Sequence, residues 1–255
     1  MILSHERPLI FLITIVSFAL LEFLIPYRNQ ESQAKKRWSS HFFLIFIFVL
    51  FQRLLLPIGL AGLAMEFSKE TVFYGLLEKE SFAAIILTFI ILDFFIYFQH
   101  RLFHKINFLW RFHEVHHTDD LLDWSSALRF HPVEMVISFG LKVCIIFVFK
   151  LEPLGVVLFE VILSSMAIFN HAKIRIPSKL DKVLEYFIVT PRMHRVHHSV
   201  LGKEMNSNYS NSISVWDYIF RTFCYKKEEQ FKLGVNSESP AKHGLIDLIK
   251  KPFIS

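Results

Sequence analysis

The sequence is poor in cysteine and shows no cleavable leader. Its 255 residues contain two cysteines, Cys144 inside an apolar run and Cys224 near the C-terminus. Two thiols so placed indicate neither a disulfide framework nor a thiolate metal site. No small-residue cleavage site follows the first apolar run, residues 9–25, so we interpret this run as a retained membrane helix rather than a signal peptide.

A continuous basic stripe is also missing. The formal net charge is +5, but the basic residues flank apolar runs instead of forming one surface. This pattern suits contact with an anionic lipid leaflet and argues against a nucleic-acid partner. There is no tandem repeat and no separately folding soluble module. We expect three parts: an N-terminal membrane helix with a basic linker (1–40), a catalytic domain (41–225) and a polar C-terminal tail (226–255) whose last fifteen residues are peripheral.

Apolar residues, by contrast, are abundant. They make up 53% of the chain, and 29 residues are phenylalanine, which is typical of a membrane protein. The second apolar run, residues 42–64, is interrupted by Gln52, Arg53 and Pro57. This interruption predicts a broken or tilted span. We therefore predict an all-α integral membrane helical bundle whose further apolar runs are residues 42–64, 82–98, 135–149 and 154–169.

The loop charges predict an orientation. The linker 28–40 is basic and the loop 66–80 is acidic, so the positive-inside rule places the first in the cytoplasm and the second outside. Counting crossings from there brings every histidine cluster to the cytoplasmic face, under a polar, helical cap that follows residue 175. The membrane would be the inner membrane in a bacterium or the endoplasmic reticulum in a eukaryote.

Histidines are the conspicuous polar feature of the chain. Two HxxHH stretches occur, HEVHH at 113–117 and HRVHH at 194–198, and HRLFH at 100–104 adds an HxxxH pair. Positions i, i+3 and i+4 share one helix face, so we expect each HxxHH stretch to direct three imidazoles to one point. Ten of the thirteen histidines lie in this part of the chain: His100, His104, His113, His116, His117, His131, His171, His194, His197 and His198.

So many imidazoles exceed the four to six ligands of a single ion, and two metal ions are the simpler interpretation. Magnesium and calcium are excluded because they prefer oxygen ligands. Spacing does not separate iron from zinc, and zinc is a possible substitute. A ligand-rich site at the mouth of an apolar bundle suits C–H cleavage on a lipid chain, which favours iron and O₂. The other histidines, His5, His41 and His243, are expected in solvent or at the membrane interface.

The three histidine stretches resemble the boxes of the fatty acid hydroxylase/sterol desaturase superfamily of membrane di-iron enzymes. Further matching motifs are Asp93, LWRF at 109–112, RFHPVE at 129–134, NH at 170–171, TPRM at 190–193, NY at 208–209 and WD at 216–217. The similarity covers about residues 40–223. Ser210 and Arg221 stand where many members have glycine.

This resemblance implies site roles. The eight box histidines would be metal ligands, and His131 and His171 would complete or border the site. Candidates for support of the ligands are Asp93, Arg129, Glu134 and Asn208. Asp93 would orient a histidine or cap a buried polar pair, and Arg129 and Glu134 are expected to pair with each other or with the cap.

The resemblance also implies the reaction: two irons and O₂ hydroxylate or desaturate a lipid, whether fatty acyl, sterol, ether lipid or isoprenoid. Electrons must come from an external donor of the ferredoxin, rubredoxin or cytochrome b5 type, because the sequence has no cytochrome, flavin or nicotinamide motif.

Two other functions compete with this one. HEVHH also fits HExxH, in which two histidines bind zinc and Glu114 acts as the base of a hydrolase. That interpretation leaves five histidines without a role, and the sister stretch carries Arg195 where the base would be. The other alternative is a non-catalytic metal-binding or transport protein, whose ligands should line a path at mid-bilayer depth.

Overall fold

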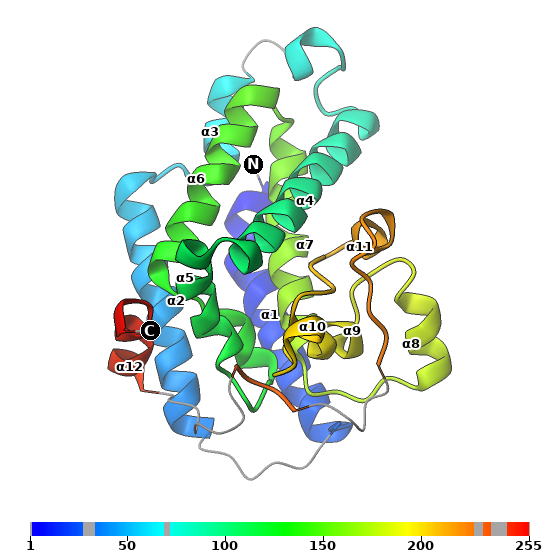
Figure 1. Cartoon of the computed structure of the whole chain (residues 1–255). Helices are drawn as coiled ribbons and strands as arrows, with labels where there is room; N and C mark the ends of the chain where they lie inside the picture. The colour runs from blue at the N-terminus through cyan, green and yellow to red at the C-terminus, as the bar shows by residue number, and fades with distance from the viewer. Residues whose placement is uncertain (1, 28–33, 69–71, 227–231, 236–243, 255) are drawn as a thin grey trace.

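A computed structural model describes residues 2–27, 34–68, 72–226, 232–235 and 244–254, and the regular elements within them are helices (Figure 1). The all-α prediction is confirmed. The long helices are α1 (Ile2–Leu24), α2 (Ala34–Leu55), α4 (Phe82–Lys105), α6 (Pro132–Phe149) and α7 (Pro153–His171). The shorter elements are α3 (Gly59–Phe67), η1 (Phe73–Gly75), α5 (Asn107–His117), η2 (Trp124–Leu128), α8 (Ser178–Leu184), α9 (Pro191–His197), α10 (Gly202–Met205), α11 (Val215–Ile219) and α12 (Leu245–Ile254).

Five candidate membrane helices match the five predicted apolar runs. Each is long and apolar enough to cross a bilayer, which makes the chain an integral membrane protein: Arg7–Leu24, Arg37–Phe67, Phe82–Lys105, Pro132–Phe149 and Pro153–His171. The predicted break in the second run is present, because α2 ends at Leu55 and α3 begins at Gly59, on either side of Pro57. Residues 28–33 of the basic linker lie outside the described residues.

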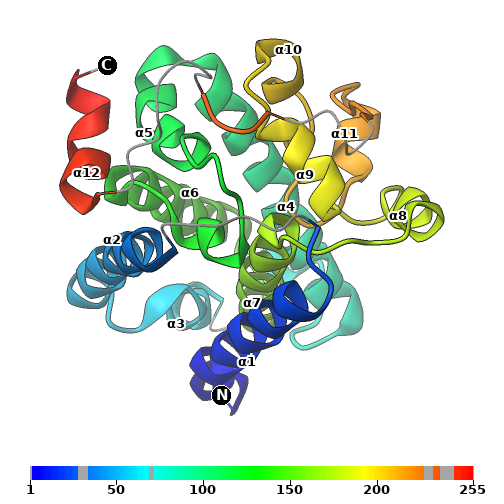
Figure 2. The same cartoon turned by 90° about the horizontal axis from the view of Figure 1, so that it is seen from below.

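Helix α7 packs against both α1 and α4, and the end-on view places it among the long helices (Figure 2). Its start is fixed on α4, where the Glu152 amide donates to the Thr88 hydroxyl at 3.0 Å. Gly155 makes this close approach possible, since a Cβ there would lie 2.7 Å from the Cβ of Thr88 and 2.9 Å from the carbonyl oxygen of Ile85. The α4–α7 contact therefore depends on the missing side chain.

The short helices α5 and α8–α11 gather at one end of the bundle (Figure 1). Helix α12, expected to be peripheral, instead lies against α2 and α5. Its Leu248 is buried with Leu44 and Val115, and the Lys251 amine pairs with the Glu114 carboxylate at 3.2 Å. The expectation of a peripheral C-terminal segment was wrong, because the apolar face of α12 packs over the second histidine stretch.

We predict that Gly155→Ala lowers the free energy of unfolding by about 1–3 kcal/mol, because the added methyl group forces α4 and α7 apart. Gly140→Ala in α6 is the matched control: a Cβ there meets nothing within 4 Å. The control should be neutral or slightly stabilising, since alanine favours helix by up to about 1 kcal/mol over glycine. Thermal unfolding of both purified variants in detergent checks this, and equal losses in the two would contradict it.

Candidate metal centre

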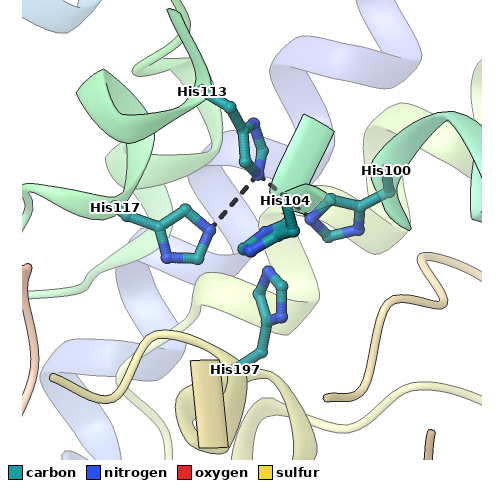
Figure 3. A group of neighbouring side chains, drawn as sticks. All are labelled: His100, His104, His113, His117 and His197. Carbon is teal, nitrogen blue, oxygen red and sulfur yellow. Dashed lines mark hydrogen bonds between the residues drawn. The ribbon is translucent and has the colours of Figure 1, made fainter. Parts of the chain in front are cut away.

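Nine of the ten predicted histidines come together in two groups at the ends of the long helices. The first group takes residues from α4, α5 and α9, and its five ring nitrogens lie within 4.8 Å of one another (Figure 3): His100, His104, His113, His117 and His197. Within it, the Nε2 atom of His113 lies 3.1 Å from that of His100 and 3.2 Å from that of His117. The group is thus compact enough for one ion.

The second group takes residues from α5, α7 and α9 and is fully buried. Its four members, which meet the same 4.8 Å limit, are His116, His171, His194 and His198. The Nε2 atom of His171 lies 3.0 Å from that of His116 and 3.0 Å from that of His194, and the His198–His194 distance is 3.1 Å. Ligands at right angles on one ion with bonds of about 2.1 Å lie about 3.0 Å apart, so the spacing fits.

Each HxxHH stretch is divided between the groups, which corrects the expectation that its three rings meet at one point. His113 and His117 enter the first group, whereas His116 enters the second. In the third stretch, His197 enters the first group, whereas His194 and His198 enter the second. The cause is helix geometry: adjacent residues project about 100° apart at 3.6 residues per turn, so positions i+3 and i+4 cannot reach the same ion while i and i+4 can.

Five of the nine rings are fixed in orientation by a hydrogen bond at Nδ1. Each Nδ1 lies at hydrogen-bond distance from an oxygen: His100 from Tyr209 O at 2.7 Å, His113 from Glu134 Oε1 at 2.6 Å, His116 from Arg129 O at 3.3 Å, His171 from Ala167 O at 2.7 Å and His197 from Ser207 O at 2.7 Å. A carbonyl or carboxylate oxygen only accepts, so each Nδ1 must carry the proton and each neutral ring presents a lone pair at Nε2.

This tautomer assignment tests whether the groups suit a metal. In the His100–His113 pair of the first group and the His116–His171 pair of the second, both Nε2 atoms are acceptors only about 3 Å apart. Two lone pairs at that distance repel, and no hydrogen bond can join them. The buried Nε2 atoms of His104 and His197 have no hydrogen-bond partner among the described residues. A cation in each group would satisfy all these nitrogens, so the donor set fits two metal ions.

Five of the rings outside the membrane-spanning segments are also held neutral. Burial, reinforced by the neighbouring histidines, lowers the pKa of His116, His117, His194 and His198 well below the ordinary value. Burial likewise lowers the pKa of His197 to about 3. Neutral imidazole is the ligand form, and these rings need not lose a proton to bind metal at neutral pH.

His131 is the tenth predicted histidine, and the structure places it outside both groups. Its Nδ1 caps α6 by accepting from the Val133 amide at 3.2 Å, and its Nε2 lies 3.2 Å from the Ile249 carbonyl oxygen of α12. Asp93 supports no ring either: its carboxylate accepts from the Trp216 indole at 2.8 Å and from the Ile213 amide. Both residues therefore fix the surrounding segments.

The other three predicted supporting residues do lie next to the groups. Glu134 and Arg129 were expected to pair with each other or with the cap, but Glu134 accepts from His113 and the Arg129 guanidinium donates to Val115 O at 2.9 Å and to the Thr118 hydroxyl. The Asn208 side chain donates to the carbonyl oxygen of Met193, just before the third histidine stretch, and to that of Cys224, which follows α11. Asn208 thereby joins the two.

A buried ionic network that sequence reasoning missed lies behind the second stretch. Arg37 of α2 pairs with Asp119 at 2.7 Å and with Asp123 at 2.8 Å. Burial opposes ionisation, but the guanidinium groups of Arg129 and Arg37 hold the pKa of Asp119 well below its usual range. His41, expected in solvent or at the membrane interface, is fully buried here, with Nδ1 3.0 Å from the Ser125 hydroxyl.

Other ionic contacts hold the third stretch. Arg192, in the turn before His194, pairs with Asp181 of α8 and with Glu185, the residue that follows α8. The Asp217 carboxylate accepts from the Tyr209 and Ser210 amides, which fixes the loop whose carbonyls hold His100 and His197. Arg221 has φ +55°, in the left-handed region that favours glycine, which agrees with the glycine that the resemblance led us to expect there.

Both groups open on one cavity of about 1550 Å³ between the long helices. His100, His113, His116, His171 and His194 line its one end. Apolar side chains follow, among them Phe11, Phe48, Phe103, Met135 and Ile168. A cavity that is apolar beside a polar centre suits a hydrocarbon chain.

A family profile described as fatty acid hydroxylase matches residues 85–222. The ornithine lipid hydroxylase OlsE of Rhizobium tropici is 27% identical over 170 residues, which cover 66% of this chain and 50% of that protein. Alkylglycerol monooxygenases of Xenopus tropicalis and Homo sapiens are each 29% identical over 148 residues, covering 56% and 55% of this chain and 31% of those proteins. The chain thus spans half or less of these relatives. No solved structure matches it.

We predict that Arg37→Met lowers the free energy of unfolding by about 3–5 kcal/mol, because it removes the guanidinium that pairs with both buried carboxylates and leaves Asp119 with the more distant guanidinium of Arg129, at 3.8 Å. Arg175→Met removes an exposed arginine and is the matched control, with an expected change within about 0.5 kcal/mol. Chemical unfolding of the detergent-solubilised variants measures both. A loss below about 1 kcal/mol for Arg37→Met would show that the network contributes little.

Proposed function

The chain belongs to the fatty acid hydroxylase family, and on that premise we propose that it is a membrane di-iron enzyme that uses O₂ to hydroxylate a lipid. The observation that carries this proposal is the pair of buried histidine groups, each with facing lone pairs, at the end of an apolar cavity. The relatives support it, since two are named a lipid hydroxylase and a monooxygenase. Desaturation, which also removes hydrogen from an unactivated carbon, is the second candidate.

The nine grouped histidines are the proposed ligands, five to one iron and four to the other. Bound there, the two irons would supply the activation of O₂ needed for breaking an unactivated C–H bond. The protein's own contribution is to fix the rings through their Nδ1 atoms, to keep water away by burial and to align the lipid chain in the cavity. In this proposal His131 caps a helix and is not a ligand.

We further propose that the histidine centre faces the cytoplasm, as the loop charges predict. Electrons would come from an external donor of the ferredoxin, rubredoxin or cytochrome b5 type. Residues 41–225 would form the catalytic unit, with α12 attached to it; the family profile matches residues 85–222 of that range.

The HExxH hydrolase fits the structure less well. Its general base would be Glu114, but that carboxylate is paired with Lys251 of α12 rather than directed at a histidine group. Its two zinc ligands, His113 and His117, share their group with three more histidines. A metal transporter is disfavoured because His100, His104 and His171 lie at the ends of candidate spans instead of along their middle.

Paired substitutions test how the stretches divide. The double variant His116→Ala with His194→Ala removes one ligand from each of two stretches, and both ligands belong to the second group. We predict that it retains one tightly bound ion per chain, in the first group. The matched control, His113→Ala with His194→Ala, strikes the same two stretches but both groups, and should release both ions at a lower chelator concentration than wild type. Iron retained against increasing chelator, measured by mass spectrometry, gives the answer. Identical retention curves for the two pairs would refute the division.

Turnover is tested in membranes of a host that expresses the chain. We expect that incubation under ¹⁸O₂ with a reductant adds one labelled oxygen to a membrane lipid, detected by mass spectrometry of the extract. The His116→Ala with His194→Ala variant should give no labelled lipid. Glu114→Gln should retain most of the product, whereas a hydrolase of the HExxH type would lose its activity and incorporate no O₂-derived label.

A further inference from the structure

A second polar cluster lies in the same cavity, away from the histidines. It consists of Arg7 of α1, Lys142 of α6 and Glu160 of α7, all of which line the cavity. Ionisable side chains within membrane helices are costly and usually mark a ligand path. None of the three contacts the histidine groups among the described residues, so the proposed ligand set gives no account of them.

The three side chains do not form a balanced set. Arg7 and Glu160 form an ion pair at 2.8 Å, which joins α1 to α7, and their side chains are 31% and 10% exposed. Lys142 is half-buried and forms no ion pair or hydrogen bond among the described residues, and the charges close enough to act on its amine are those of Glu160 and Arg7. With all three ionised, two positive charges face one negative charge. In that state the cluster would carry a net charge of +1.

We propose that this cluster binds the anionic group, carboxylate or phosphate, of an amphiphilic lipid whose hydrocarbon chain extends toward the histidine groups. An unbalanced charge inside a membrane bundle is unfavourable, and a bound anion next to Lys142 removes the imbalance. The apolar stretch of the cavity between the two polar ends, with Phe11, Phe48 and Met135, suits the chain. The Arg7–Glu160 pair alone would fasten the helices, and Lys142 is not needed for that.

The positions also set where the lipid would react. Lys142 follows Glu134, the partner of His113, by eight residues on α6, or ~12 Å along the helix. Glu160 precedes His171 by eleven residues on α7, or ~16 Å. This inference rests on the function proposed above. The separation places an inner carbon of the lipid's hydrocarbon chain at the metal centre, and not the carbon beside the anionic group.

Equilibrium binding to the purified full chain in detergent tests the site without turnover. The probe is radiolabelled hexadecyl phosphate, and the competitors are hexadecanol, which has the same chain without the charge, and inorganic phosphate, which has the charge without the chain. Lys142→Met should weaken hexadecyl phosphate binding by about ten- to a hundredfold, the range of a hydrogen bond to a charged group, and leave hexadecanol within about threefold.

Two further variants keep the test decisive even if Lys142→Met folds poorly. Glu160→Gln raises the local charge to +2 and should tighten hexadecyl phosphate binding, whereas a purely structural ion pair predicts no gain. Lys179→Met, an exposed lysine of α8 outside the cavity, is the matched control and should change nothing.

Three results would overturn the proposal: equal binding of hexadecyl phosphate and hexadecanol by the wild type, unchanged binding by a folded Lys142→Met variant, or competition by inorganic phosphate as strong as by the lipid probe. No iron, O₂ or reductant enters the measurement. Binding without lipid oxidation would therefore refute the proposed function and leave the anion site in place, and oxidation without charge-dependent binding would do the opposite.

Discussion

The arrangement of this protein depends on one electrostatic constraint: nine largely buried imidazoles converge, and five of them are forced by the oxygens behind them to present lone pairs at Nε2. Without a cation this is unfavourable, because acceptors about 3 Å apart repel and burial keeps the rings from turning to water. With a cation in each group the same contacts become favourable. The protein is thus preorganised for positive charge, and much of its remaining polar structure keeps the rings from turning away.

The polar residues around the centre act through the backbone. Asp217 and Asn208 do not contact the groups, yet they fix the loop whose Ser207 and Tyr209 carbonyls hold two rings, one on α9 and one on α4. Asn208 itself adopts φ +51°, a conformation that asparagine tolerates better than most residues. Arg37 and Asp119 secure the segment that ends at the Arg129 carbonyl in the same way. A hydrogen-bond network around Asp217 and Asn208 and an ionic network around Arg37 thus position one centre.

Sequence periodicity was sufficient for the long helices and for the eight histidines of the three stretches, because apolar runs and HxxxH spacing are local properties of the chain; His171 was expected only from the family resemblance. It failed for the division of each HxxHH stretch, where the angle between His116 and His117 had to be considered and was not. It also failed for Arg37 and Asp119, which are 82 residues apart, so no local pattern joins them. The roles of His131 and His41 were missed because a buried histidine and an exposed one look alike in sequence, and partners such as Ile249 and Ser125 come only with the fold.

The place of the centre at the end of the bundle follows from the same constraint. Within a membrane helix the backbone carbonyls are already used by the helix, and no water replaces them, so they can hold few imidazole N–H groups. Three of the carbonyls that fix rings here, those of Arg129, Ser207 and Tyr209, belong to non-helical segments outside the candidate spans. A centre of neutral histidines needs such segments, whereas its proposed lipid substrate needs apolar depth. The junction between the bundle and its cap provides both the non-helical segments and the apolar cavity. The cavity extends from this junction to Lys142.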